Sequence, residues 1–133
     1  VFSGSRSWAN KEFVNFILET YIDTGSVIVH GHAKGLDAVV DELAGRKWFS
    51  VVRYRADWNQ YGRAAGPIRN REMIAIRPER VFCFHKDISE SRGTKDMYKE
   101  CKKRSIPVTL FDEDGNTVEQ YDGENDLFTR ARR

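Results

Sequence analysis

Apolar residues along this sequence follow two alternating patterns. Short runs rich in β-branched and aromatic residues, typical of buried strands, occur at residues 1–2, 26–30, 50–54, 81–85 and 107–111. The segments between them repeat apolar residues with the 3.6-residue helical period, most clearly over 36–44 and also over 13–22 and 97–101. A fourth helix, with a weaker period, is predicted to start at Pro67.

This alternation predicts a doubly wound α/β fold. We expect a mostly parallel, five-stranded sheet with helices on both faces, because parallel strands are joined by crossover helices that pack back onto the sheet. We assign residues 1–111 to this domain. Residues 112–133 are predicted to form a short C-terminal extension, with a hairpin signal at Asp114-Gly115 followed by a polar tail.

The loops that follow the predicted strands are small, polar or basic. Ligands of doubly wound folds bind beyond the carboxyl ends of the strands, so we expect these loops to meet at one edge. Glycines let backbone amides approach a ligand, and the first amides of a helix attract anions. The pattern predicts a site for a phosphate that carries a sugar and a base. The candidate contacts are Gly4, Ser5, Arg6, Gly31, His32, Lys34, Gly35, Arg92, Gly93 and Thr94.

These turns also have an ordinary structural interpretation. A glycine-rich turn between a strand and a helix is typical of a simple connector, so no single turn identifies a site. Ser5 and Thr94 are more typical of helix caps than of ligand contacts. It is the combination of three such turns at one edge that favours an anion site.

A long segment, residues 56–71, adds aromatic side chains to the same edge. Trp58 and Tyr61 can stack on a base, or they can cover the edge of the sheet as minor core. For Trp58 we expect both uses. The sequence does not separate these alternatives.

The same segment is rich in arginine. The planar guanidinium groups of Arg63 and Arg69 suit phosphate binding, whereas Arg71 is expected to be a solvated helix residue. Asn70 is predicted to position either the loop or a ribose hydroxyl.

Composition and charge limit the partners of the chain. Its 133 residues are 40% hydrophobic and carry a net charge of +2, which indicates one soluble domain and makes a nucleic-acid partner unexpected. Cys83 and Cys101 lack metal or redox spacing, and the sequence has no signal peptide or long apolar span. We therefore predict a cytoplasmic protein with no membrane contact, no metal and no cofactor. We also expect that a few residues precede Val1.

Four stretches resemble one known family. In order and spacing, "GSR", "VHGHAKGLD", "ADWNQYGRAAGPIRNREM" and "SRGTKDM" are similar to the YspA/YpsA-related branch of the SLOG superfamily, which groups DprA-like and LOG-like proteins. The similarity spans residues 2–111. It implies a Rossmann-like fold that binds nucleotides or nucleotide-derived molecules without the dinucleotide fingerprint or the P-loop, both absent here. It also implies a homo-oligomer, most simply a dimer.

The resemblance further implies residue roles. LOG proteins are phosphoribohydrolases that use an Arg and a Glu, and these positions fall on Arg69 and Met97 in this sequence. A thioether cannot transfer a proton or stabilise an oxocarbenium ion as a carboxylate does. Asp96 is adjacent, but one step along a helix turns a side chain by about 100°, so it should point elsewhere. Asp37 and Asp57 are the remaining candidate acids.

Three functions stay open from the sequence. The first is a binding or sensing domain for a nucleotide-derived small molecule, such as a signalling nucleotide, and the methionine at position 97 favours it. The second is a hydrolase or transferase that acts on a nucleotide's glycosidic or phosphate bond through Arg69 with Asp37 or Asp57. The third is DprA-like binding of single-stranded DNA, which the mild net charge argues against.

Overall fold

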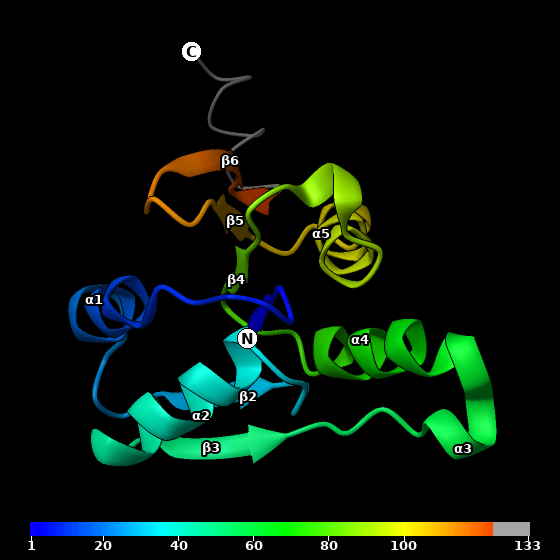
Figure 1. The fold of residues 1–133 in the computed structure, drawn as a ribbon, viewed down its shortest axis with the longest axis horizontal. Coiled ribbons are helices and arrows are strands. Elements are labelled where there is room, and N and C mark those ends of the chain that lie inside the picture. The colour runs from blue at the N-terminus through cyan, green and yellow to red at the C-terminus, as the bar shows by residue number, and fades with distance from the viewer. Residues whose placement is uncertain (124–133) are drawn as a thin grey trace.

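The computed structural model describes residues 1–123 and shows a Rossmann-like α/β fold with one six-stranded sheet (Figure 1). The strand order is β3-β2-β1-β4-β5-β6, with β1 to β5 parallel and β6 antiparallel. The strands are β1 (Phe2–Gly4), β2 (Val27–His30), β3 (Ser50–Arg53), β4 (Val81–Phe84), β5 (Val108–Phe111) and β6 (Thr117–Tyr121). The predicted mostly parallel doubly wound sheet is confirmed.

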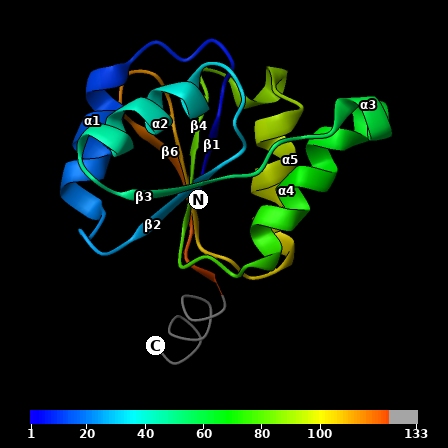
Figure 2. The same ribbon diagram turned by 90° about the horizontal axis from the view of Figure 1, so that it is seen from below.

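Helices cover both faces of the sheet. They are α1 (Lys11–Tyr21), α2 (Leu36–Arg46), α3 (Trp58–Tyr61), α4 (Ala65–Ala75) and α5 (Gly93–Lys103), with 3₁₀ turns η1 (Gly62–Ala64) and η2 (Ile88–Glu90). Figure 2 shows α1 and α2 on one side of the strands and α4 and α5 on the other. The short elements α3 and η1 were not predicted, because four residues are too few to show a helical period.

The two helix layers enclose two separate cores. On β4, Phe82 and Phe84 pack toward α1 and α2, while Val81 and Cys83 pack toward α4 and α5. This is the alternation of side chains along a strand. All four residues are buried, which explains why the strand reads as a continuous apolar run.

A hairpin extends the sheet beyond the five predicted strands. The Asp114-Gly115 turn, with Gly115 at φ +86°, reverses the chain after β5 and lets β6 pair with it in antiparallel register. The side chains of β6 are mostly exposed, so its polar sequence gave no strand signal. The predicted polar tail lies largely in residues 124–133, outside the described residues.

Side chains cap the helices at positions that only partly match the predictions. Asn10 caps α1 by accepting from the Phe13 amide at 3.0 Å. The hydroxyl of Ser91 accepts from the Thr94 amide at 2.9 Å, so Ser91 caps α5 and Thr94 does not. Thr94 is instead a buried residue of the first turn.

A sizeable hollow in the described residues lies away from the predicted site. Its volume is about 890 Å³, and Val1, Val27, Val29 and Arg80 are among the residues that line it at the amino ends of the strands. β1 lies between β2 and β4, but its first residue, Phe2, pairs with His30 at the far end of β2. The first three residues of β2, which starts at Val27, therefore have no β1 residue beside them, and the sheet is open there. The hollow therefore follows from strand lengths rather than from converging polar loops.

No helix among residues 1–123 is long and apolar enough to cross a membrane.

The aromatic cluster beneath α1 should dominate stability. Phe84 is fully buried, and its ring lies 5.3 to 6.1 Å from the rings of Phe2, Trp8, Phe13 and Phe111. Phe84→Ala should lower the free energy of unfolding by about 3–5 kcal/mol in urea titrations. The matched change Trp48→Ala, at a side chain 93% exposed, should stay within about 0.5 kcal/mol. Similar losses in the two variants would contradict this account of the core.

Candidate functional site

Loops from three strands meet at the carboxyl edge of the sheet. The Ser5 amide donates to the Phe84 carbonyl, and the Ser5 carbonyl accepts from the Leu36 amide, both at 2.9 Å. Gly35 has φ +72°, and a Cβ there would overlap the backbone of Ser5 and Arg6. The loop after β1 is thereby fixed to β4 and to the start of α2, as the predicted convergence requires.

Arg69 of α4 lies directly over the loop after β2. Its Nη1 donates to the Gly31 carbonyl at 2.6 Å, and its Nε donates to Asn70 Oδ1 at 3.1 Å. A Cβ on Gly31 would overlap the guanidinium group. A glycine is therefore required at position 31 because the Arg69 guanidinium packs against it. From the sequence, this glycine was expected instead to make room for a ligand.

Asn70 joins the same site to α5. Its side chain is buried, and Nδ2 donates to the Gly93 carbonyl at 3.3 Å and to Asp96 Oδ2 at 3.1 Å. The side chain of Met97 is buried in the core, whereas that of Asp96 points to Asn70, so the two neighbours point in different directions as expected. The direction that Asp96 takes, toward Asn70, was not foreseen because it depends on how α4 and α5 pack.

Charges of both signs act on Arg69. Burial lowers the pKa of the Arg69 guanidinium, the nearby Asp37 carboxyl raises it, and the positive charge of Arg6 lowers it further. The attraction of Arg69 to the Asp37 carboxyl is thus larger than its repulsion from Arg6, and Glu72 adds a smaller attraction.

Asp37 is the most unusual acid of the site. It is 5% exposed; Oδ2 accepts from the Ala33 amide at 3.1 Å, while Oδ1 has no hydrogen-bond partner among the described residues. Burial raises the pKa of its carboxyl, opposed by the backbone of Ala33 and of Gly31 and by the positive charge of Arg69. A buried acceptor without a partner is costly and needs a compensating role.

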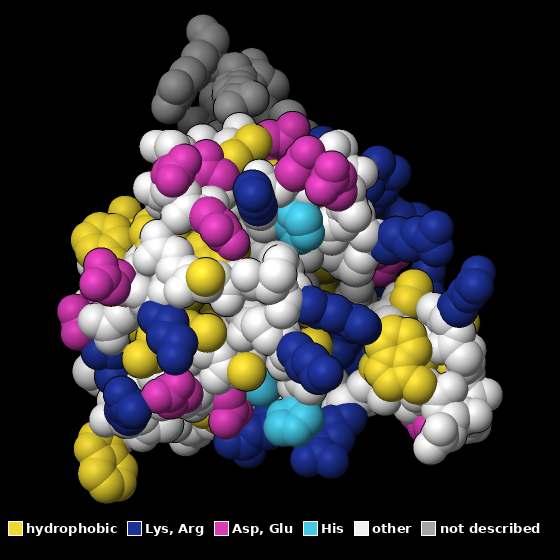
Figure 3. Space-filling view, viewed as in Figure 1, with side chains coloured by type: hydrophobic (Ala, Val, Ile, Leu, Met, Phe, Trp, Pro, Cys, Tyr) yellow, Lys and Arg dark blue, Asp and Glu magenta, His cyan; other side chains and the backbone are white. Residues whose placement is uncertain are grey.

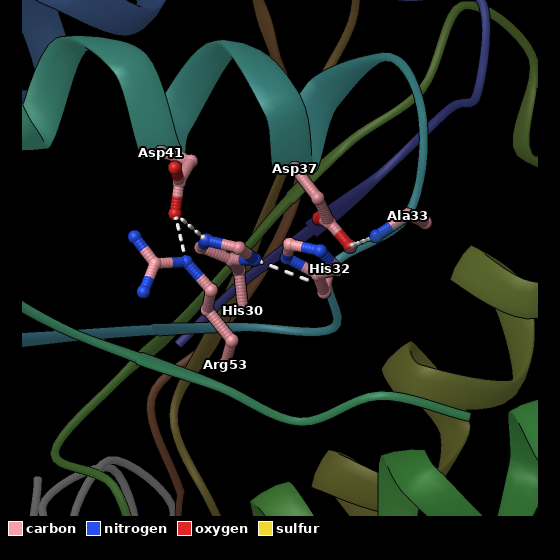
Figure 4. Close-up of polar contacts among 6 residues, drawn as sticks. All are labelled: His30, His32, Ala33, Asp37, Asp41 and Arg53. Atoms are coloured by element: carbon pink, nitrogen blue, oxygen red, sulfur yellow. Dashed lines mark hydrogen bonds and ion pairs between the residues drawn. The ribbon is translucent and has the colours of Figure 1, made fainter. Parts of the chain in front are cut away.

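A chain of polar contacts shapes the loop after β2 (Figure 4). Arg53 Nε and His30 Nε2 both contact Asp41 Oδ1, at 2.6 and 2.8 Å. His30 Nδ1 accepts from the His32 amide at 2.9 Å, so its Nε2 carries the proton toward Asp41. This chain holds His32 at φ +54°, an uncommon backbone conformation for a residue with a side chain.

Several amides of this loop are already engaged by the protein itself. The His32 amide donates to His30, the Ala33 amide to Asp37 and the Leu36 amide to Ser5. Fewer backbone amides are therefore free to bind an anion in this loop than the sequence predicted. These three amides are therefore not available, whereas Arg69 uses only two of its five N–H donors on the described residues.

Aromatic side chains stand beside the two arginines. The Arg6 guanidinium lies 5.5 Å from the centre of the Trp58 ring, whose edge rests on Gly66 at the start of α4. Trp58 and Tyr61 are 48% and 44% exposed, so neither is core. Asp57 caps α3 by accepting from the Gln60 amide at 3.1 Å, which gives this predicted acid a structural use.

The structure brings only part of the predicted set together. The gathered group comprises Gly4, Ser5, Arg6, Gly31, Gly35, Asp37, Trp58, Arg69, Asn70 and Gly93. His32 and Lys34 line a separate shallow hollow of about 300 Å³ beside Asp41 and Glu42. Arg63 and Arg92 are exposed, and no contact among the described residues ties either side chain to the group. Lys and Arg side chains gather on this face of the molecule near α3 (Figure 3).

Among the described residues, no cluster of three or more His, Cys, Asp or Glu side chains is placed to hold a metal ion.

Comparisons with known proteins agree with these motifs. Residues 1–61 match the model of the YspA, cpYpsA-related SLOG family. The gene 61 protein of Mycobacterium phage D29 is 33% identical over 117 residues, which cover 82% of this chain and 92% of that relative. The chain belongs to the YspA, cpYpsA-related SLOG family. The matched part of this SLOG chain includes the loops after β1 and β2, and the phage protein's name states no activity. No solved structure matches the chain.

The close approach of Arg69 to Gly31 can be tested by filling the space. Gly31→Ala should displace the guanidinium and leave the Gly31 carbonyl without its donor, at a cost of about 1–3 kcal/mol in the free energy of unfolding. In an Arg69→Ala background the same change should cost much less. Gly45→Ala, at a helical site with open space, should instead stabilise by about 0.5–1 kcal/mol. Equal costs of Gly31→Ala in both backgrounds would rule out the contact.

Asp37 should give the SLOG chain a specific pH dependence. Its pKa is higher in the folded chain than in the unfolded chain, so its contribution to stability is fully present at low pH and is lost as pH rises through the folded pKa. The free energy of unfolding of the wild type, minus that of Asp37→Asn, should therefore fall as pH rises above the ordinary pKa of an aspartate, about 4. Asp41, whose pKa Arg53 and His30 lower, titrates in both proteins and cancels. A difference that rises with pH would contradict the assignment.

Proposed function

We propose that the chain binds a nucleotide or nucleotide-derived small molecule at the carboxyl edge of the sheet, with its phosphate between Arg6 and Arg69. The observation that carries this proposal is the guanidinium of Arg69 seated on Gly31 at this edge, with Arg6 of the loop after β1 near enough for its charge to act on Arg69. A phosphate between them would be held by charge-assisted hydrogen bonds from planar guanidinium groups. Membership of the SLOG family supports a nucleotide-related ligand.

The hydrogen-bond inventory of Arg69 supports the same assignment. A guanidinium group has five N–H donors. Among the described residues Arg69 uses one on Asn70 and one on Gly31, which leaves three for a ligand. The two contacts that it makes also fix its orientation, so little side-chain entropy is lost when an anion binds.

Hydrolysis of the ligand is the second candidate function, and Asp37 favours it. A buried carboxyl with a raised pKa and an unpartnered oxygen, close to the charge of Arg69, has the properties of a general acid. Release of free adenine from AMP, abolished by Asp37→Asn while AMP still binds, would establish this activity. Binding without any released base would leave a sensor.

Two further expectations stay predictions: assembly as a homodimer and location in the cytoplasm. Single-stranded DNA binding stays an alternative, and no contact among the described residues favours it.

Two arginines of α4 allow a matched test of the phosphate site. Arg69 lies over Gly31, whereas Arg71 is exposed and its Nε lies 3.9 Å from Glu100 on α5. AMP should raise the melting temperature of the wild type and of Arg71→Ala. In Arg69→Ala its affinity should fall by about tenfold or more, because a charge-assisted contact is lost. An equal loss in both variants would show a general charge effect and would contradict the proposed site.

A further inference from the structure

We propose that Trp58 is the base-stacking platform of the site and that Arg6 covers its ring until a nucleotide binds. This inference rests on the proposed function, since it concerns the base and the phosphate of the same ligand. In the free protein the Arg6 guanidinium lies over the Trp58 ring. On binding, Arg6 moves from the ring to the phosphate, and the base takes its place against the ring.

The burial of α3 shows that this segment does not fill the core. None of its residues is buried, although two of the four are large aromatics. Figure 1 shows α3 at the end of the molecule that lies away from α1. Cη2, at the edge of the Trp58 ring, lies near Gly66 of α4, where an added Cβ would be 3.4 Å away. The side chain is 48% exposed, so much of the ring is not covered by the fold.

Arg6 is placed so that its side chain can move while its backbone stays fixed. Its backbone packs against Gly35, and its neighbour Ser5 is hydrogen-bonded to Phe84 and Leu36. The side chain itself is exposed. A cation over an exposed ring is held weakly, whereas a guanidinium bound to phosphate is held strongly. A phosphate at Arg69 would therefore draw Arg6 away from Trp58.

The exchange also relates the position of the phosphate to that of the base. Arg6 is close enough to Arg69 to affect the pKa of its guanidinium, and it also contacts Trp58. One ligand can therefore place an anionic group between the arginines and a flat ring on Trp58. Stacking on an aromatic ring accepts any base, because every base has a π-face. The ligand class is a nucleotide whose base is recognised mainly by stacking at this platform.

Calorimetric titration with AMP and ribose 5-phosphate tests the platform, because these probes differ only in the adenine base. Trp58→Ala should weaken AMP between about fivefold and 150-fold and leave ribose 5-phosphate unchanged. Trp58→Tyr keeps an aromatic face and should keep most of the AMP affinity. Trp48→Ala, which removes a tryptophan 93% exposed on the turn between α2 and β3, should change neither probe.

The movement of Arg6 has its own readout. In a Trp48→Phe background, acrylamide quenching should report mainly on Trp58, because Trp8 is buried. Arg6→Ala should increase the quenching of the free protein, and AMP should decrease it in the presence of Arg6. Arg6→Ala should also weaken both probes, since both carry the phosphate.

The outcomes separate this inference from the proposed function. If Trp58→Ala weakens both probes equally, or neither, the platform is wrong while the phosphate site stands. Unchanged quenching in Arg6→Ala would overturn the covering role of Arg6. Failure of both probes to bind the wild-type chain at millimolar concentration would overturn the proposed function, and the platform with it.

Discussion

The candidate site depends on one contact, the guanidinium group of Arg69 seated on the backbone of Gly31. This contact brings α4, which comes from the far side of the sheet, against the loop after β2. Asn70, the next residue, extends the connection to Gly93 and Asp96 at the start of α5. Two adjacent residues of one helix thus hold the loop after β2 and the start of α5 in register. This arrangement leaves Arg69 as a partly buried cation, which Asp37 stabilises and Arg6 opposes to a smaller extent.

The topology of the sheet makes this contact possible. β1 lies between β2 and β4, so the chain changes direction across the sheet at β1, and α4 crosses to the face opposite α1 and α2. A doubly wound sheet opens a crevice at such a point, because neighbouring loops leave in opposite directions. The loop after β1, which carries Arg6, and the helix α4, which carries Arg69, both lie beside this point. The larger hollow at the amino ends of the strands lacks this convergence: its Arg80 already donates to Thr109 and Asp122.

Some side chains of the site hold the loops in place through hydrogen bonds, whereas others are exposed and can contact a ligand. His30, Asp41 and Arg53 are linked to one another and fix the backbone at His32 (Figure 4). Ser5 and Gly35 fix the backbone beside Arg6. The exposed side chains of Arg6 and Trp58 therefore project from a rigid base. A rigid base lowers the entropy lost on binding, and mobile side chains allow the site to open.

The sequence by itself determined the fold class, because alternating strand and helix periods leave few arrangements that bury both faces of a sheet. It also placed the candidate loops at one edge and pointed to Arg69, Asn70 and Trp58. It signalled the hairpin turn at Asp114-Gly115 but not β6 as a sixth strand of the sheet, because the exposed side chains of β6 carry no strand pattern. It also assigned the α5 cap to Thr94 instead of Ser91. Only the tertiary structure decided that Gly31 accommodates an arginine, that Asp96 faces Asn70 and that Arg6 covers Trp58. Each of these contacts joins residues that different elements bring together, and pairing across elements is set by packing geometry rather than by local periodicity.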